Sequence, residues 1–214
     1  MARKKKTTKG SGTTREQSKH ERRRRILAAA ARLFEQSGFS ATTMEAVAEK
    51  AGVGVATVYN YFRTKEGMVH ELITPDLHRV WALNEKVIAK PPEDPADAVL
   101  AIVRNFQTAF DNWRFRKLLR ALTLPTLTGA PGIIQQLVDW SDKQAEQQFR
   151  DLLRALQLRG RLHPKADVKR MATIVFATFN HEYMLYITHE NLPAKRVFSD
   201  IEDLVRTMFQ PWRP

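Results

Sequence analysis

The chain has 214 residues, of which 43% are hydrophobic, so it can bury a core of its own. It contains no cysteine, which excludes disulfide frameworks, thiolate catalysis and Cys-ligated metal sites. The formal net charge is +12, and residues 1–25 carry +9 of it, because eleven Lys or Arg there face only Glu16 and Glu21. A nearly neutral body with a concentrated basic end is typical of a protein that binds nucleic acid.

The basic end opens the chain as a polar segment. Residues 1–20 mix Lys, Thr, Gly and Ser without apolar periodicity, so we expect a basic arm that is disordered when free and able to order on DNA. A first helix is expected from Glu21 to Ser37-Gly38. Its apolar stripe consists of Ile26, Leu27, Ala30, Leu33 and Phe34.

Two short helices should follow. Thr42 and Glu45 have the spacing of a capping box, and the second helix should stop at Gly52. The third helix is expected near Val55–Phe62. A tight crossing of two helices needs a small residue at the contact and a glycine in the turn, which Ala48 and Gly52 supply at a spacing of four.

The rest of the chain keeps a helical period, and no strand-like alternation competes with it. A fourth helix should open at Thr64-Lys65-Glu66 and end before Pro91. Further helices are expected over Ala96–Trp113, Arg116–Leu124, Ile133–Leu158, Ala166–Thr188 and Ala194–Phe209. The fold class is therefore predicted to be all-α with about nine helices. The predicted domains are a disordered arm (1–20), a three-helix helix-turn-helix domain (21–66) and a larger helical domain (67–214).

One ordered set of residues in and around the second and third helices makes the functional prediction for this region more specific. It consists of Gly52-Val53, Thr57-Val58-Tyr59, Tyr61-Phe62 and Lys65-Glu66, and it resembles the signature of the TetR family of transcriptional regulators over about Arg24 to Met68. Gly54 departs from that pattern, because many members have a serine there, although glycine still caps a helix acceptably.

The resemblance implies that the third helix enters the major groove of double-stranded DNA. Base-edge or groove contacts are then expected from Val55, Ala56, Thr57 and Asn60, and phosphate contacts from Tyr59, Tyr61 and Lys65. Thr43, which opens the second helix, should also contact a phosphate. Arg24 is expected to bind DNA as well. Asn60 is the only one of these side chains that can make a bidentate contact with adenine. We therefore expect DNA shape and the basic arm to contribute to recognition of the operator as well.

A reader this small usually works as a symmetric pair on a palindromic operator. The last two helices carry stripes suited to pairing, and the resemblance implies a homodimer held by a four-helix bundle. The stripes comprise Met171, Ile174, Val175 and Thr178, and then Val197, Ile201, Leu204, Val205 and Met208. For any single residue, intramolecular core is nearly as good an interpretation.

The resemblance also implies a ligand-sensing cavity among the middle helices. The candidate ligand-binding residues are Trp113, Phe115, Trp140, Phe149, Phe176, Phe179, His181 and Tyr183. Aromatic residues at helical spacing are more often plain core, whereas His181 is a polar group on an otherwise apolar helix.

No motif favours catalysis. His181-Glu182 lacks the histidine four positions on that a zinc-protease helix needs, and no nucleophile elbow, Walker loop or dinucleotide fingerprint occurs. Asp139 and Asp142 are interpreted as a solvated helix face. We therefore expect no enzyme activity, no cofactor and no metal site.

The favoured hypothesis is a repressor that a small-molecule effector releases from its operator. The alternative is a TetR-like DNA-binding protein without such an effector, acting architecturally or through a protein partner. No stretch approaches the roughly 18 consecutive apolar residues of a membrane span, so we expect a soluble protein without a membrane partner. The absence of cysteine favours a cytoplasmic one.

Overall fold

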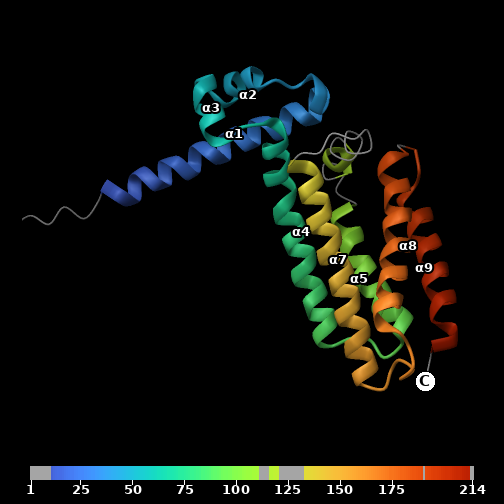
Figure 1. Ribbon diagram of the computed structural model, residues 1–214. Coiled ribbons are helices and arrows are strands. Elements are labelled where there is room, and N and C mark those ends of the chain that lie inside the picture. Colours follow the sequence, from blue (N-terminus) through green and yellow to red (C-terminus); the bar gives the residue numbers. More distant parts are fainter. Residues whose placement is uncertain (1–10, 111–115, 121–132, 190, 213–214) are drawn as a thin grey trace, which may run out of the picture. The chain divides into compact units, whose positions relative to one another are not determined.

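The computed structural model describes residues 11–110, 116–120, 133–189 and 191–212 (Figure 1). All regular structure in these ranges is helical, which confirms the predicted all-α fold class. The chain divides into two compact units, Met1–Leu72 and Ile73–Pro214. The helices are α1 (Ser11–Ala41), α2 (Met44–Ala51), α3 (Val55–Tyr61), α4 (Lys65–Ala89), α5 (Pro95–Phe110), α7 (Ile133–Leu158), α8 (Val168–Thr188), α9 (Ala194–Phe209) and the 3-10 turn η1 (Gln210–Trp212).

In the first unit, α1 packs against α2, and α2 packs against α3. The stripe predicted on α1 points inward at Ile26, Ala30 and Phe34, which are at most 2% exposed. The buried partners on the other elements are Met44, Val47, Ala48, Val58, Phe62, Met68 and Val69. The small core therefore forms from the apolar positions that the helical period picked out.

The start of α1 differs from the prediction. The helix begins at Ser11, so the expectation of a disordered arm through residue 20 is wrong for residues 11–20. Residues 15–20 are exposed, and the helix they form buries no apolar face. Four of these residues, Arg15, Glu16, Gln17 and Lys19, have high helix propensity, and adding turns to a helix that is already nucleated costs little. Apolar periodicity could not reveal such an extension.

The end of α1 agrees with the predicted break, but the cap of α2 does not. Gly38 interrupts the helix with φ 82° and ψ 165°, a conformation that glycine adopts readily. Thr43 rather than Thr42 caps α2, since its hydroxyl accepts the Ala46 N–H at 3.1 Å. Thr42 is buried and donates its own hydroxyl to the Gly38 carbonyl at 2.8 Å. The predicted capping box is wrong by one position, because Thr42 satisfies a carbonyl left free at the break.

The tight turn between α2 and α3 forms as predicted. Gly52 lies in the left-handed region, with φ 65° and ψ 43°, and its N–H donates to the carbonyls of Ala48 and Glu49. An added Cβ at Gly52 would meet nothing within 4 Å, so backbone conformation, not space, calls for glycine. Gly54 then opens α3 in an extended conformation, without a side-chain cap.

The second unit is a bundle. The domain boundary expected at 66/67 lies inside α4, which passes from the first unit into the second. Helices α5, α7, α8 and α9 lie alongside one another (Figure 1). On α7 the fully buried core residues are Phe149, Leu152, Leu153 and Leu156. No helix among the described residues combines the length and apolar character needed to cross a lipid bilayer.

Residues 116–120 are helical and are fastened to the end of α8 by Arg116. Its guanidinium donates to the Tyr186 carbonyl at 2.7 and 3.0 Å and to the His189 carbonyl at 2.8 Å. The guanidinium carbon also lies 3.8 Å from the centroid of the Tyr186 ring. These contacts hold Leu119 at the wall of a cavity in the second unit.

Candidate nucleic-acid interface and ligand cavity

Helix α3 has one buried side and one outward side. Val58 is fully buried, and Phe62, four residues on, is 3% exposed. The outward residues are Val55 and Tyr59, which are 37% and 46% exposed, and Ala56 and Asn60, which are also exposed. Thr57 and Tyr61 are partly exposed. Two inward residues therefore fix the helix and leave the predicted reading residues on its free side.

This outward side offers varied chemistry in one helical turn and a half. The Asn60 amide both donates and accepts, as a bidentate contact with adenine requires, and the methyl groups of Val55 and Ala56 suit thymine methyls. The Tyr59 hydroxyl can donate to a phosphate oxygen. On α2, the exposed Thr43 uses its oxygen as an acceptor, so its O–H stays available as a donor.

Lys65 has a structural role that the sequence did not reveal. Its ammonium donates to the carbonyls of Phe39 and Ser40 at 2.9 and 3.4 Å and lies 4.7 Å from the Phe39 ring centroid. The side chain thus ties the start of α4 to the end of α1. An ammonium has three N–H groups, so one donor remains beyond these two bonds.

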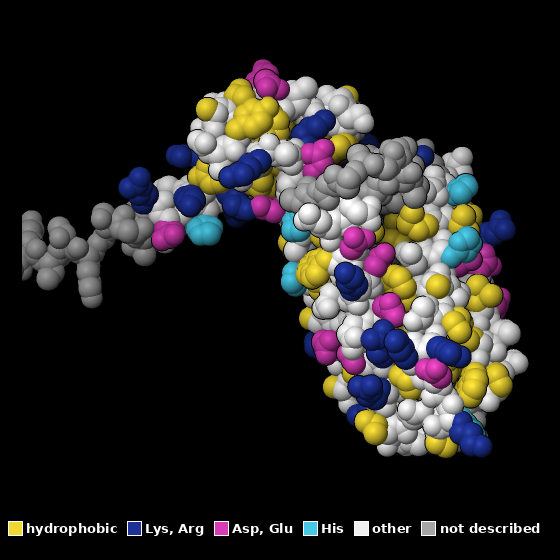
Figure 2. All heavy atoms as spheres, viewed as in Figure 1, with side chains coloured by type: hydrophobic (Ala, Val, Ile, Leu, Met, Phe, Trp, Pro, Cys, Tyr) yellow, Lys and Arg dark blue, Asp and Glu magenta, His cyan; other side chains and the backbone are white. Residues whose placement is uncertain are grey.

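The arginines at 22–25 divide by position. Arg23 turns toward the unit, where its guanidinium pairs with Glu71 and lies 5.0 Å from the Phe62 ring centroid. Arg24 is exposed and pairs with Glu21 at 2.9 Å. The exposed basic residues of α1 whose side chains are described are Arg15, Lys19, Arg22, Arg24, Arg25 and Arg32. Dark blue side chains mark this run on the extended part of α1 in Figure 2.

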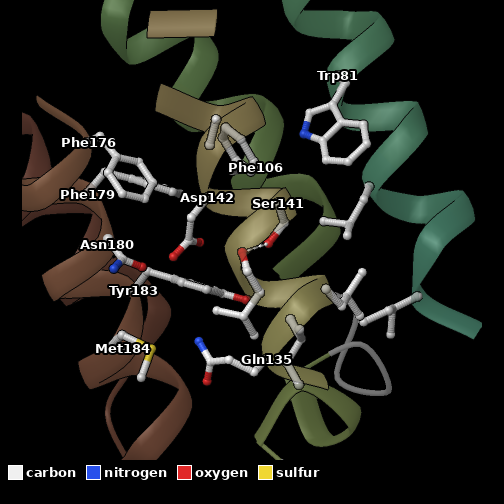
Figure 3. A pocket seen from close by; sticks show the side chains of 16 residues that line it. Trp81, Phe106, Gln135, Ser141, Asp142, Phe176, Phe179, Asn180, Tyr183 and Met184 are labelled. Carbon is white, nitrogen blue, oxygen red and sulfur yellow. Dashed lines mark hydrogen bonds between the residues drawn. The ribbon is translucent and has the colours of Figure 1, made fainter. Parts of the chain in front are cut away.

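The second unit contains a partly open cavity of about 250 Å³ (Figure 3). Its walls come from α4, α5, α7 and α8 and from Leu119. The described lining residues are Ile73, Leu77, Trp81, Phe106, Leu119, Gln135, Leu137, Val138, Ser141, Asp142, Ala145, Phe176, Phe179, Asn180, Tyr183 and Met184. A mostly apolar lining with a few polar groups is the usual composition of a small-molecule site.

The predicted ligand-binding residues separate into three groups. Phe176, Phe179 and Tyr183 line the cavity. Phe149 is fully buried in the core, Trp140 packs edge-on against Trp81 with ring centroids 4.6 Å apart, and His181 is exposed; none of these three lies in the described lining. Trp113 and Phe115 lie outside the described residues.

Asp142 is the ionisable side chain that the sequence interpretation misplaced. The expected solvated face exists only at Asp139, which is exposed, whereas Asp142 lies in the cavity wall. Burial, and secondarily the charge of Asp139, raise the pKa of Asp142 to about 6. Burial also raises the pKa of Tyr183 well above its usual value, with Asp142 and Tyr186 contributing. The sequence did hold a signal for this difference. Asp142 lies three residues before the buried Ala145 and so on nearly the same face of α7, whereas Asp139 lies six residues before it.

The predicted pairing stripes also divide. Met171, Val175, Val197, Ile201 and Val205 are buried within the chain, which is the intramolecular interpretation. Ile174 and Leu204 are 52% and 46% exposed, and Thr178 and Met208 are partly exposed. Helices α8 and α9 pack on each other, so they carry large exposed apolar residues on adjacent elements.

The geometry of the described residues defines a class of protein: an all-helical chain with an outward-facing helix-turn-helix and a second helical unit that contains a cavity. Residues 26–72 match the sequence profile described as bacterial regulatory proteins, tetR family. The similarity to the TetR family in sequence is therefore carried by this segment, which holds α2, α3 and the adjoining parts of α1 and α4.

One curated relative and two solved structures illustrate the similarity. An uncharacterized HTH-type transcriptional regulator of Bacillus subtilis (strain 168), YhgD, is 46% identical over 41 residues, which make up 19% of this chain and 22% of that relative. The match therefore spans less than a quarter of the relative's length.

Structural similarity extends over most of the chain. SmeT, the repressor of the Stenotrophomonas maltophilia multidrug efflux pump SmeDEF, solved with triclosan, has a TM-score of 0.72 and 18% identity, covering 91% of this chain and 92% of that one. Thermus thermophilus FadR, a TetR family repressor solved with lauroyl-CoA, has a TM-score of 0.64 and 20% identity, covering 88% and 93%. At these identities the similarity establishes the fold.

Proposed function

We propose that this protein is a homodimeric transcriptional repressor that binds a palindromic operator and is released by a small molecule held in the cavity of its second unit. The observation that carries the proposal is the outward side of α3, where Val55, Ala56, Tyr59 and Asn60 are exposed on a helix fixed by Val58 and Phe62. We assign no catalytic role to the chain. As a bacterial regulator of this kind it would act in the cytoplasm, where its operator lies.

In the proposed complex, α3 lies in the major groove. Val55, Ala56, Thr57 and Asn60 contact base edges there. Tyr59, Tyr61, Thr43, Arg24 and the remaining donor of Lys65 contact phosphates, which position the reader without specifying sequence. The exposed basic residues of α1 add a sequence-independent attraction.

The dimer would form through α8 and α9. Ile174 and Leu204 are large apolar side chains left about half exposed on two helices that pack together, so a second copy of the same surface could cover them. Two-fold symmetry would then present two α3 helices to half-sites about one turn of DNA apart, or a multiple of that.

The cavity supports an effector over the alternative of a regulator without one. Triclosan and lauroyl-CoA occupy the solved structures of SmeT and T. thermophilus FadR, which share this fold. An effector can release the operator only if it binds the DNA-free conformation more tightly than the DNA-bound one.

Replacing Tyr59 with Ala tests the reader. The wild-type protein first selects duplexes from a random library, and fluorescence anisotropy then measures the affinity of Tyr59→Ala and Tyr59→Phe for a selected duplex. Tyr59→Ala should weaken binding by about tenfold or more, and its free energy of unfolding should change by less than about 0.5 kcal/mol because the side chain is exposed.

The matched control is Gln36→Ala, an exposed position near the end of α1. It should bind the duplex as the wild type does. If the wild type selects no common sequence, or Tyr59→Ala binds as tightly as the wild type, α3 is not the reader.

A further inference from the structure

We propose that the cavity is built for a compact aromatic cation, an organic ammonium whose positive charge pairs with the carboxylate of Asp142. The inference rests on the proposed function in taking this cavity as the effector site, and it names the chemical class of the ligand.

The first reason is the aromatic character of the walls. Trp81 of α4, Phe106 of α5 and Phe176, Phe179 and Tyr183 of α8 all line the cavity. The Phe179 and Tyr183 rings are parallel within 1°, with centroids 5.9 Å apart, and the Phe106 centroid is 4.9 Å from that of Phe179. Ring faces carry partial negative charge and attract cations, while the rings also shelter an apolar body.

The second reason is the sign of the charge. Asp142 is the carboxylate among the described lining residues, and these include no Lys, Arg or His. Within the described residues the Asp142 carboxylate makes no hydrogen bond or ion pair, and the charge that acts on it is the negative one of Asp139. A carboxylate taken out of water needs a counter-charge, and the described lining residues supply none, so a cationic ligand would supply it.

The third reason is the placement of Asp142 among the polar groups. Figure 3 shows its carboxylate, from α7, turned toward Asn180 and Tyr183 of α8. The Ser141 hydroxyl is already used, because it donates to the Val138 carbonyl at 2.9 Å. A ligand ammonium beside Asp142 would therefore lie between a charged acceptor and an amide, with aromatic rings around the rest of the molecule.

The volume limits the size of the ligand. A cavity of about 250 Å³ is smaller than the usual range for drug-sized ligands, about 300–1,000 Å³, so the fitting molecule is compact. An anion of equal size would face the charge of Asp142 with no described lining cation to offset it.

Three small probes of related shape test the inference on the full-length protein. These are benzyltrimethylammonium, its uncharged carbon analogue neopentylbenzene, and the anion phenylacetate, each titrated while intrinsic tryptophan fluorescence is followed. The wild type should bind benzyltrimethylammonium more tightly than phenylacetate. Asp142→Asn should lose about tenfold or more of the affinity for the cation, and its affinity for neopentylbenzene should change by less than about twofold, which shows that the cavity is intact.

Asp139→Asn is the matched control, because it removes a negative charge from the same helix outside the cavity wall. It should leave the affinity for the cation within about twofold of the wild type. The proposal is overturned if the wild type does not bind benzyltrimethylammonium, if phenylacetate binds more tightly, or if Asp142→Asn binds the cation as the wild type does.

The pH dependence adds a second readout. The titratable groups that act on Asp142 are Asp139 of α7 and Tyr183 of α8, and the lining residues of α4, α5 and 116–120 carry none. Because the permanent cation binds the ionised carboxylate, its affinity should fall about tenfold between pH 7 and pH 5. Asp142→Asn should lose this dependence, and a dependence that persists in Asp142→Asn contradicts the pairing.

A DNA-release measurement in the same solutions separates the inference from the proposed function. If benzyltrimethylammonium binds through Asp142 but no probe alters retention of the selected duplex, the ligand class stands and effector release fails. If phenylacetate or neopentylbenzene releases the duplex while the cation does not bind, effector release stands and the ligand class fails.

Discussion

Asp142 is a carboxylate in the cavity wall whose ionisation is made unfavourable by burial. Its pKa in the folded protein is about 6, against an ordinary value of 3.8, because burial disfavours the charged form. The folded state therefore holds more protons than the unfolded state between these two values, and the free energy of unfolding decreases as the pH rises through them. Above pH 6 the cost of the buried charge is fully present.

Asp142→Asn should remove that cost. We expect the variant to be more stable than the wild type at pH 7, by at most about 3 kcal/mol, a bound that residual solvent access lowers. At pH 4 the difference should nearly vanish. Urea unfolding at both pH values measures it, with Asp139→Asn as the reference for an exposed aspartate. Equal differences at the two pH values would show that Asp142 is not held in an unfavourable ionised state.

The role of a residue could be predicted from the sequence where its local sequence neighbours determine that role. Gly52 and Val58 were assigned correctly, because a tight turn and an inward helical position are set within a few residues. Lys65 and Asp142 were not, because the partners of Lys65 lie 25 and 26 residues away and the cavity around Asp142 is assembled from several helices. Sequence spacing alone does not show which distant groups meet.

At the scale of the element, the limits of sequence reasoning follow from what a helix buries. The periods of α7 and α9 predicted their observed bounds, since a long apolar stripe marks both ends of a helix. The exposed start of α1 buries nothing and went undetected. For α8 and α9, the stripes were visible, but the chain's own core took Val175 and Ile201, which left Ile174 and Leu204 outside.

Three elements of the bundle are joined by a buried set of amides. Asn84 of α4 donates to Gln148 of α7 at 2.8 Å and accepts from Asn105 of α5 at 3.0 Å. Gln148 in turn donates to the Trp81 carbonyl at 3.1 Å and to Glu85 at 3.2 Å. Each bond holds only when the three helices keep one axial alignment, so the set specifies how α4, α5 and α7 pack.

Asn84→Ala should therefore be costly. It leaves an acceptor on Gln148 and a donor on Asn105 without their partner, so the free energy of unfolding should fall by about 2–4 kcal/mol. Urea denaturation measures the loss. Gln147→Ala, at an exposed position next to Gln148, should cost less than about 0.5 kcal/mol; a similar loss in both variants would mean that the buried bonds contribute little.

At the scale of the whole molecule, dimerisation can be tested through residues that the fold leaves outside. Ile174→Glu combined with Leu204→Glu should convert the protein to monomers in sedimentation velocity, because a charge would be buried at the proposed interface. Both side chains are about half exposed, so the monomer should stay folded. Leu158→Glu is the control, since Leu158 is 82% exposed on α7, outside α8 and α9. A wild type that sediments as a monomer contradicts the proposed dimer.

The basic end of the chain should act on every duplex alike. A chain beginning at His20 lacks seven Lys or Arg, two of which, Arg15 and Lys19, lie on the exposed part of α1. Binding should weaken for selected and unrelated duplexes together, and the slope of log affinity against log salt should decrease by about 0.9 for each phosphate that the shortened chain no longer neutralises. Anisotropy titrations over a range of salt measure the slope, and an unchanged slope means that the arm does not bind DNA.

The separation of the two sides of α3 bears on how such a regulator can change its target over generations. Because Val58 and Phe62 hold the helix, the side chains at 55, 56 and 60 can be exchanged with small effects on folding. If α3 reads the operator as proposed, single substitutions at these positions can change the preferred operator and leave the scaffold and the cavity untouched. A library randomised at these three positions would sample altered binding sites while retaining a folded parent.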